Sequence, residues 1–491
     1  MDREEPMAFA PVKLLLLFTW FLCGLYALKA GEEKLGKRYG TLKGYYNLLA
    51  VFLGPVAIAY CYLRGDAWNF IIGLFRARRN DKAKQEIPVV ILDAKGNRLS
   101  DSGDEHDALS FLKQLIYDAV KKRCSDIFID PKNDAYSVRI RVDGAIKIYN
   151  MLPSEMALAV ISTVKVAAGM DIAEKRRPQD GSFSALVEED QPSFRVASVG
   201  VFGGEKITIR VMASDMGQRK LESIGLSREQ YKIISSAIRL PSGMVLMCGP
   251  TGSGKTSTLY AMLGSIDYNM KNVISIEDPI EHVMPSISQM EVNIKADITF
   301  ASLLRNALRQ NPDVICVGEI RDEETAEIAV HASQTGHLII ATLHSNDNIG
   351  TIDRLMNLGI PLRSIAATLH VVISQRLIRK LCPHCKAKAE LTAEQKAFME
   401  RYGFPTDNIY APQGCPNCDG TGYLGRQALF EILVMDAGLR AVLEAPNASN
   451  TTIQEYVDSH QNTANIAGQA LTLVSSGVTS YEEFERVTIN I

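Results

Sequence analysis

The sequence has no large excess of charge of either sign. Its formal net charge is −3 over 491 residues, and 22% of the residues are charged. A strongly basic chain would indicate nucleic acid as a partner, and this balance gives no support to that class. The sequence also has no basic stripe interleaved with aromatic residues. The length is too great for one hydrophobic core, so three or more domains are expected.

Cysteine is scarce, and its spacing excludes a disulfide framework. There are nine cysteines, and five of them occur singly, where they are expected to pack as small apolar side chains: Cys23, Cys61, Cys124, Cys248 and Cys316. The other four form two C-x-x-C pairs, Cys382 with Cys385 and Cys415 with Cys418. Such pairs indicate a metal in a reducing compartment.

The N-terminus lacks the pattern of a cleaved signal peptide, because it is acidic and no clear cleavage site follows. Residues 14–28 and 45–63 are uncharged, and an apolar piece at 68–75 is followed by arginines. We predict a membrane-associated hairpin within residues 1–75; a buried helical hairpin is the alternative. The loop between the two runs is basic. Two full spans would place this loop outside the membrane, where basic residues are disfavoured. A re-entrant hairpin, or one that lies in the membrane interface, is therefore a further alternative.

Residues 76–106 are charged and broken by proline and glycine, so they are predicted to be a linker, with a short strand possible at 87–92. A small α+β domain is expected over 107–213. The domain begins with apolar residues at helical spacing, and two β-hairpins follow with turns at Asp143-Gly144 and Gly203-Gly204. Residues 214–240 are expected to connect this domain to the next one.

The segment 249–256 reads Gly-Pro-Thr-Gly-Ser-Gly-Lys-Thr, which is G-x-x-x-x-G-K-T. A short apolar run precedes it and a helical sequence follows, as a phosphate-binding loop requires. Backbone N–H groups of such a loop surround an anion, the lysine reaches the outer phosphates and the threonine holds Mg²⁺. The residues predicted to bind ATP are Gly249, Pro250, Thr251, Gly252, Ser253, Gly254, Lys255, Thr256 and Ser257.

Three more apolar runs, at 273–276, 314–317 and 338–343, alternate with helical segments. This alternation predicts a parallel sheet, and ligands bind outside the carboxyl ends of its strands. The runs end at Glu277 and Glu281, at Glu319, and at His344. Glu319 is placed to orient or deprotonate a water molecule, Glu277 and Glu281 could support Mg²⁺ or that water, and His344 could sense the γ-phosphate.

Three further motifs, at 274–281, 313–322 and 335–344, follow the phosphate loop in order. Together they resemble the aspartate box, the atypical Walker B and the histidine box of the secretion ATPases of type II secretion and type IV pilus assembly. The resemblance covers roughly 107–435. It implies an α/β fold, with a PAS-like domain before a RecA-like ATPase core, here 241–375. It also implies that six chains assemble into a hexamer. It also implies arginines that reach the phosphates from the PAS-like domain, here Arg195 and Arg210.

The two cysteine pairs, separated by residues 386–414, suit tetrahedral Zn²⁺ in a closed structural site. The intervening stretch is predicted to loop out as a helical insert near 392–402. A redox role is the rival interpretation, which two pairs disfavour. The pattern resembles the tetracysteine insert of assembly-type family members, here 376–427, and a helical subdomain is expected over 428–491.

Two positions depart from the family pattern. Asn311 stands where the family usually has aspartate, outside the expected chemistry. The hydrophobic N-terminus stands where most relatives carry a soluble adaptor-binding domain, which puts docking by that route in doubt.

The sequence therefore predicts a hexameric ATPase on the cytoplasmic side of the inner membrane. Through a polytopic inner-membrane platform protein, it would power assembly of a pilus or a secretion pseudopilus, with no nucleic-acid partner. The alternatives are a retraction motor or conjugation-type secretion ATPase, a nucleic-acid translocase, and a scaffold that binds ATP without turnover.

Overall fold

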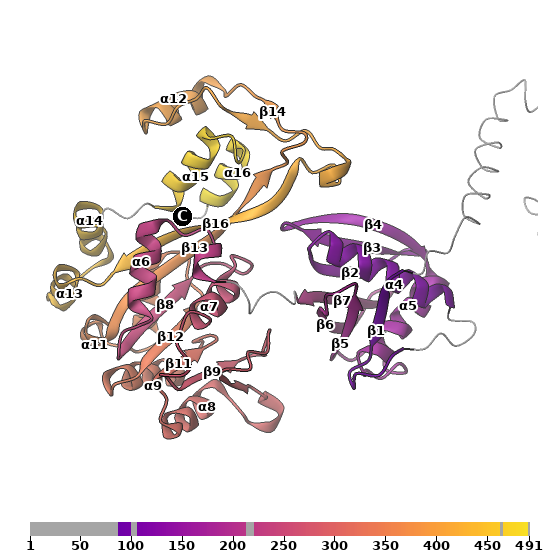
Figure 1. Ribbon diagram of the computed structural model, residues 1–491, viewed down its shortest axis with the longest axis horizontal. Helices are drawn as coiled ribbons and strands as arrows, with labels where there is room; N and C mark the ends of the chain where they lie inside the picture. The colour runs from indigo at the N-terminus through magenta and orange to yellow at the C-terminus, as the bar shows by residue number, and fades with distance from the viewer. Residues whose placement is uncertain (1–86, 100–105, 213–219, 462–464, 490–491) are drawn as a thin grey trace, which may run out of the picture. The chain divides into compact units, whose positions relative to one another are not determined.

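The structure is a computed structural model that describes residues 87–99, 106–212, 220–461 and 465–489 (Figure 1). The predicted membrane hairpin of residues 1–75 lies outside the described residues. The described residues all belong to one compact unit, residues 87–491. Within the described ranges, no helix is both long enough and apolar enough to cross a membrane.

The first part of this unit is a seven-stranded antiparallel sheet with two helices. The strand order is β1-β5-β6-β7-β2-β3-β4. The elements are β1 (Val89–Leu92), α4 (His106–Lys121), β2 (Cys124–Lys132), β3 (Ala135–Val142), β4 (Ala145–Pro153), α5 (Ser154–Ala167), β5 (Gln179–Val187), β6 (Ser193–Val201) and β7 (Gly204–Met212). Both predicted hairpins are confirmed. The strand considered at 87–92 is present as β1, and it pairs with β5, so that part of the predicted linker belongs to this sheet.

Buried and exposed residues alternate along the strands of this sheet, so one face is apolar and the two helices cover it. Leu112, Leu115 and Ile116 of α4 are fully buried, as are Val160 and Val164 of α5. These side chains pack with the inward residues of the strands in one core. On β6 and β7 the alternate residues point to the opposite face and are more exposed, Arg195 and Arg210 among them. That arrangement leaves a basic face on the first sheet.

The second sheet is mainly parallel, in the order β10-β9-β11-β12-β8-β13-β16. Its strands are β8 (Gly243–Cys248), β9 (Val273–Glu277), β10 (Ser288–Glu291), β11 (Val314–Val317), β12 (Leu338–Leu343), β13 (Leu369–Leu381) and β16 (Tyr423–Val434). The helices around it are α6 (Arg228–Ala237), α7 (Lys255–Leu263), α8 (Phe300–Ala307), α9 (Glu323–Gln334), α10 (Asn348–Asn357) and α11 (Leu362–Thr368). All four predicted parallel strands are present and adjacent to one another, and the antiparallel pair β13–β16 extends the sheet.

The central strands are buried on both faces. Met244 and Leu246 of β8 pack into one core with α8 and α9, while Val245 and Met247 pack into the other core with α6 and α7. Every residue of β8 is buried. Removal of such side chains from water stabilises a sheet by about 1.5–3 kcal/mol for each large apolar residue, so the strand ends have a rigid foundation.

The predicted boundaries near 375 and 427 fall inside β13 and β16. The cysteine module is therefore an excursion from the far end of that strand pair, since Cys382 follows β13 directly and Cys418 precedes β16. The module contains β14 (Ala387–Lys388), β15 (Tyr410–Ala411) and α12 (Ala393–Arg401), which confirms the predicted helical insert. The sequence missed the strand pair because its ladder joins segments far apart in the chain.

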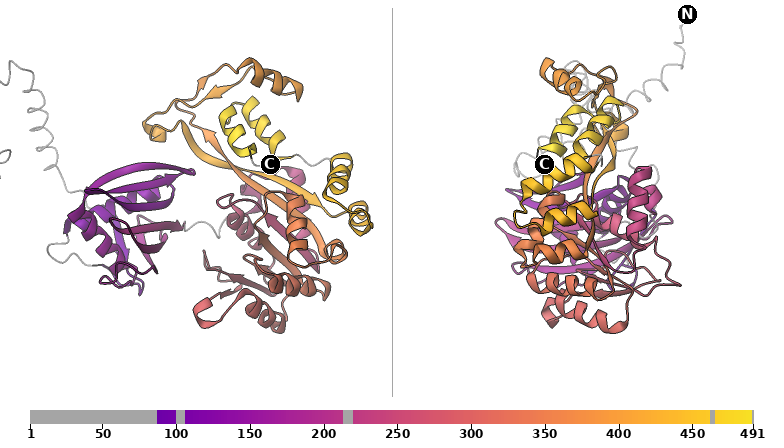
Figure 2. Two further views of the ribbon diagram at one scale, coloured as in Figure 1. Left: turned by 180° about the vertical axis from the view of Figure 1, so that it is seen from behind. Right: turned by 90° about the vertical axis from the view of Figure 1, so that its left-hand side faces the viewer.

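Four helices complete the chain: α13 (Ala437–Glu444), α14 (Asn450–His460), α15 (Ile466–Ser475) and α16 (Tyr481–Thr488). Figure 2 shows α15 and α16 beside β13 and β16, which they contact. The buried carboxylate of Glu483 on α16 accepts hydrogen bonds from Arg379 of β13 and from Arg486. This charged cluster anchors the last helix to the sheet.

Candidate nucleotide-binding site and cysteine cluster

The phosphate loop joins β8 to α7, and its glycines have conformations that other residues rarely adopt. The φ angles are +140° at Gly249, +79° at Gly252 and +91° at Gly254. A Cβ at Gly249 would lie 2.5 Å from the carbonyl oxygen of Gln375. The helix α7 begins at Lys255, so its unpaired N–H groups face the loop. Only glycine allows this close approach of the backbone.

The side chains of the loop form a donor set that fits a phosphate. Lys255 Nζ donates to the carbonyl oxygens of Gly249 (2.6 Å) and Pro250 (3.3 Å). Burial lowers the pKa of Lys255, and the negative charge of Glu319 opposes that change. Ser253 Oγ is buried and, among the described residues, has no hydrogen-bond partner. An unpaired hydroxyl, an ammonium group and a helix N-terminus at one loop are suited to a polyphosphate.

Glu319 lies two residues beyond the end of β11, and its side chain is mostly buried. Its Oε1 lies 2.9 Å from Nε2 of His344, which follows β12. The backbone N–H of Ile320 donates to Thr342, so the two strand ends are joined. The structure therefore brings together Glu319 and His344, which the sequence placed on separate strands.

Arg321 is a residue of this cluster that the sequence reasoning missed. Its Nε donates to Glu319 Oε2 at 2.7 Å, and a second guanidinium nitrogen lies 3.2 Å from Asp278 Oδ2. It thus connects the ends of β11 and β9. The position of Arg321 inside the motif at 313–322 could have indicated a role in the site. The sequence did not show which carboxylates Arg321 would pair with.

Glu281 lies on the loop after β9, close to the start of α7. Burial raises the pKa of this carboxyl, while the positive charges of Arg210 and Arg195 and a hydrogen bond with Thr256 lower it. The negative charge of Glu277 acts in the same direction as burial. Glu281 is thus associated with Thr256, which the sequence predicts to hold Mg²⁺.

Glu277 has a different environment from Glu281, although the sequence assigned the two residues one role. The residue is 6% exposed, and both of its carboxylate oxygens accept hydrogen bonds. Tyr260 donates to Oε2, and Ser275 and Gln289 donate to Oε1. The Glu277 carboxylate is therefore buried and hydrogen-bonded to neutral donors at both oxygens.

Arg195 and Arg210 face each other across β6 and β7 of the first sheet. Both are exposed, and Arg210 Nε lies 3.5 Å from Asp126 Oδ1 on β2. This ion pair is weak because the Arg210 side chain is 57% exposed. Arg210 is thus available for a second anion.

A buried arginine beside the loop was also missed. Arg376 of β13 is 6% exposed and donates to the carbonyl oxygens of Asn346 (2.5 Å) and Gln375 (3.2 Å). Burial lowers its pKa. It supports the backbone against which Gly249 packs. The sequence could not reveal this role, because it depends on the long strand β13.

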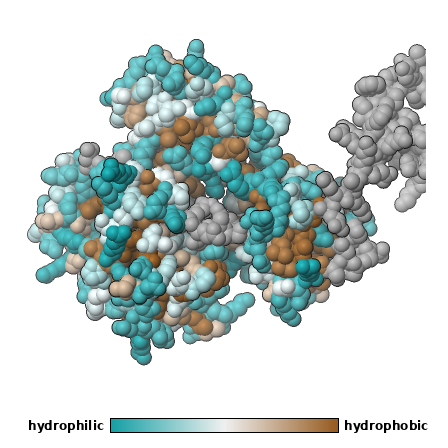
Figure 3. Space-filling model, in the orientation of Figure 1, coloured by the Kyte–Doolittle hydropathy of each residue, from teal (hydrophilic) through white to brown (hydrophobic). Residues whose placement is uncertain are grey.

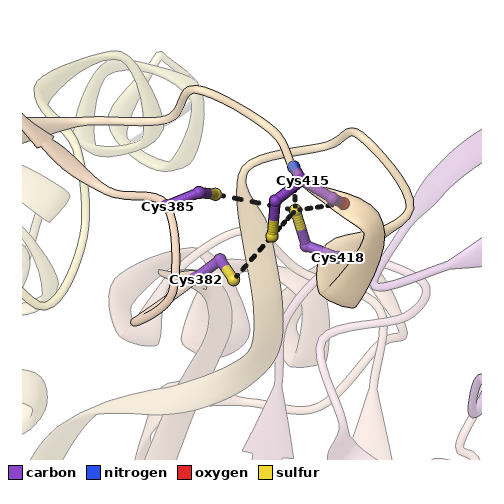
Figure 4. Close-up of side chains that lie close together, drawn as sticks. All are labelled: Cys382, Cys385, Cys415 and Cys418. Carbon is purple, nitrogen blue, oxygen red and sulfur yellow. Dashed lines mark hydrogen bonds between the residues drawn. The ribbon is translucent and has the colours of Figure 1, made fainter.

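The four paired cysteines form one cluster (Figure 4), with all four sulfur atoms within 4.8 Å of one another. Neighbouring sulfurs lie 3.7 to 3.9 Å apart. A tetrahedron with metal–sulfur distances of about 2.3 Å has edges of about 3.8 Å. The cysteines are free rather than disulfide-bonded. Their arrangement fits one tetrahedral ion such as Zn²⁺, as the sequence predicts.

Backbone donors favour a thiolate at this cluster. Burial raises the pKa of Cys418, but N–H groups of Cys415 and Gly422 donate to its sulfur and bring the pKa down to about 6. For Cys385, burial raises the pKa to about 12. A readily formed thiolate at Cys418 is a suitable start for metal capture.

The parallel sheet, its loop and the acidic strand ends define an α/β nucleotide-binding fold. Solved structures share it. DotB from Legionella pneumophila, an ATPase, matches with a TM-score of 0.58 at 23% identity, over 78% of this chain and 96% of DotB. The pilus retraction motor PilT, solved with ADP, matches with a TM-score of 0.53 at 24% identity, over 76% and 96%.

The family model described as "Type II/IV secretion system protein" matches residues 101–486. Type II secretion system protein E of Aeromonas hydrophila is 38% identical over 390 residues, 79% of this chain and 77% of that protein. The type IV pilus assembly ATPase PilB of Pseudomonas aeruginosa is 37% identical over 79% of this chain and 69% of PilB. The chain belongs to the type II/IV secretion system protein family, and the resemblance seen in the sequence is confirmed.

Proposed function

We propose that this chain hydrolyses ATP and works as a hexameric motor for type IV pilus assembly or for a type II secretion pseudopilus. One observation carries the hydrolysis: four strand ends of one parallel sheet converge on the phosphate loop. They bring Lys255, Glu281 and the Glu319–His344 pair to one edge. The names of the related proteins, which include PilB and protein E, support the coupling to pilus assembly or secretion.

In the proposed reaction, the loop N–H groups and Lys255 hold the β- and γ-phosphates, and Thr256 would hold Mg²⁺, which would neutralise charge on the phosphates. Glu319 accepts a hydrogen bond from the attacking water and draws its proton. His344 and Arg321 orient Glu319 through its two oxygens. Phosphoryl transfer needs positioning and charge stabilisation, and these residues supply both.

Arg195 and Arg210 are proposed to complete the site from the first domain, which we assign as PAS-like. Their positive charges lower the pKa of Glu281, which supports a location near the nucleotide. A site built from two domains changes shape when the nucleotide changes, which is the two-state element that a motor needs.

The hexamer and the membrane partners are proposed from the family. Exposed apolar residues of the first domain support an oligomeric contact: Ile146 and Ile148 on β4, Val199 and Val201 on β6, and Phe202 at the following turn. Figure 3 shows apolar patches on one face of an otherwise mostly hydrophilic surface. We place the motor on the cytoplasmic side of the inner membrane, against a polytopic platform protein. The cysteine cluster favours assembly over retraction.

The substitution Glu319→Gln tests the hydrolytic role. It is expected to lower kcat by about 10²-fold or more, because the water loses its proton acceptor, while a fluorescent ATP analogue still binds. Glu327→Gln, on the exposed side of α9, is the control. Unchanged turnover in Glu319→Gln would remove the proposed mechanism. In the native cell, failure of Glu319→Gln to restore pili or secretion to a deletion strain would support the coupling.

A further inference from the structure

A buried polar network lies beneath the loop that carries Glu281, between α7, β9 and β10. Its centre is the Glu277 carboxylate. Tyr260 Oη donates to Oε2 at 2.5 Å, and Ser275 Oγ and Gln289 Nε2 donate to Oε1 at 2.6 and 3.0 Å. Tyr260 is 1% exposed. Burial and the bond to Glu277 raise the pKa of Tyr260, so its hydroxyl remains a donor.

The same network holds the main chain of the residue that follows Glu281. The His282 N–H donates to Tyr260 Oη at 3.1 Å, and the His282 carbonyl accepts from Gln289 Nε2 at 2.9 Å. Gln289 Oε1 accepts from the Met284 N–H at 2.7 Å. Both backbone polar groups of His282 are therefore paired with side chains that also donate to Glu277.

The two glutamates of the box consequently differ in what they can do. Glu277 is buried and already accepts two hydrogen bonds at Oε1 and one at Oε2 from neutral donors, which disfavours contact with a metal ion or a phosphate. Glu281 is associated with Thr256 at the start of α7. Tyr260 lies on the same helix as Thr256, so the network ties the Glu281 loop to the helix that begins at the phosphate loop.

We infer that Glu277, Tyr260 and Gln289 are positioning residues, which hold Glu281 at the nucleotide by clamping the backbone of His282. In this assignment Glu281 alone of the two glutamates touches Mg²⁺ or its water, and the sequence-based role of Glu277 in the chemistry is replaced by a supporting one. The inference deepens the proposed function and rests on the role of Glu281 in it. A displacement of a catalytic group by about 1 Å lowers a rate by up to about 10²-fold, so such a clamp matters.

The main test is Tyr260→Phe, which keeps the packed ring and removes the hydroxyl. The expected result is a fall in kcat of about 10-fold, with the KM for ATP and the affinity for a fluorescent ADP analogue changed by less than about 2-fold. The matched control is Tyr268→Phe. This hydroxyl donates to the Leu263 carbonyl outside the network, and its loss is expected to leave kcat unchanged.

A double-mutant cycle shows whether Tyr260 acts through Glu281. In a Glu281→Gln background, Tyr260→Phe is expected to cause no further loss of kcat, because the group that it positions is already disabled. Multiplicative effects of the two substitutions would overturn the inference. If Glu281→Gln itself leaves kcat unchanged, the proposed role of Glu281 fails first, so the two failures are distinguishable.

Amide hydrogen exchange gives a readout that does not depend on turnover. In Tyr260→Phe, a peptide covering 278–287 is expected to exchange faster, while peptides from β8 and β12 keep their protection. Gln289→Leu is expected to have the same effect through Met284. Unchanged exchange in both variants would overturn the clamp.

Glu277→Gln separates the two glutamates directly. The amide keeps one acceptor oxygen, so a smaller loss of kcat than in Glu281→Gln is expected, with Mg²⁺ dependence unchanged. A loss as large as that of Glu281→Gln, together with a higher Mg²⁺ requirement, would place Glu277 at the metal and overturn the inference.

Discussion

The nucleotide site and the cysteine cluster both join residues from distant segments, but different forces hold them. The nucleotide site stands on strand ends between two apolar cores, and its side chains add little to the fold. The cysteine module has two strands of two residues each and one short helix, with few buried apolar side chains such as Met399 and Ile409. Where a core is large, site residues are free for chemistry; where a core is small, the site residues must stabilise the fold themselves.

The largest expected effect is that of Lys255→Ala. Loss of the ammonium group removes the charge that meets the phosphates, so we expect turnover to fall by about 10³-fold and nucleotide affinity by at least about 10-fold. The Tm without nucleotide should change by less than about 2 °C, because Lys255 contacts only loop carbonyls. Lys295→Ala, on an exposed segment, is the control. A large drop in Tm would contradict the difference drawn between the two sites.

For the cysteine cluster we expect the opposite result: removal of the metal should lower the stability of the fold. Purified protein is expected to contain one zinc ion per chain by mass spectrometry, and Cys415→Ser should lose it. The Tm should then fall by about 5–10 °C, because the module loses its main cross-link. His384→Ala should keep the zinc, since four thiolates already complete the site. Protein that lacks stoichiometric zinc before any treatment would count against the metal site.

Arg210→Ala tests the contribution of the first domain to the nucleotide site. We expect kcat to fall by about 10- to 10²-fold, since a positive charge is lost near the transferred phosphoryl group, while nucleotide affinity changes by less than about 3-fold. Arg177→Ala, whose side chain is 86% exposed in the same domain, is the control. Equal effects of the two substitutions would mean that Arg210 acts only through general surface charge.

The smallest expected effect concerns stability and the Glu281 carboxyl. Its pKa is raised in the folded protein, so the folded state binds the proton more tightly than the unfolded state. Stability from this group is present below the ordinary pKa of glutamate and is lost as the pH rises through the raised value. Glu281→Gln should therefore raise the Tm at pH 7–8, by on the order of 2 °C, with no gain near pH 4. A Tm gain that does not depend on pH would contradict this cause.

Much of the fold was predictable, because its signals are local. The apolar runs that became β8, β9, β11 and β12 are short and bounded by turn residues, and the two hairpins of the first domain carry Asp-Gly and Gly-Gly turns. The strand β5 was missed, because its sequence 179–187 mixes polar and apolar residues without a clear run. The pair β13–β16 was missed for a different reason: its segments are separated by the cysteine module.

The candidate site was predictable in its members but not in their contacts. Lys255, Glu319 and His344 were recognisable because each follows a predicted strand closely. Arg321 stood in the same motif, yet its partners, Glu319 and Asp278, depend on the spacing between neighbouring strands. Arg376 depends on β13 lying beside β8, which only the folded chain reveals.

Residue type and spacing alone determined the phosphate loop, the order along the chain of the strands that surround it, and the four cysteines, because backbone geometry and metal preference are local properties. Packing determined which donors surround the carboxylates of Glu277 and Glu281. The roles that we propose for the two residues follow from their surroundings, and the donors of α7 and β10 lie beside Glu277 only when the sheet has formed. Hydrogen bonding acts over about 3 Å, so a role that depends on it is settled by the tertiary contacts.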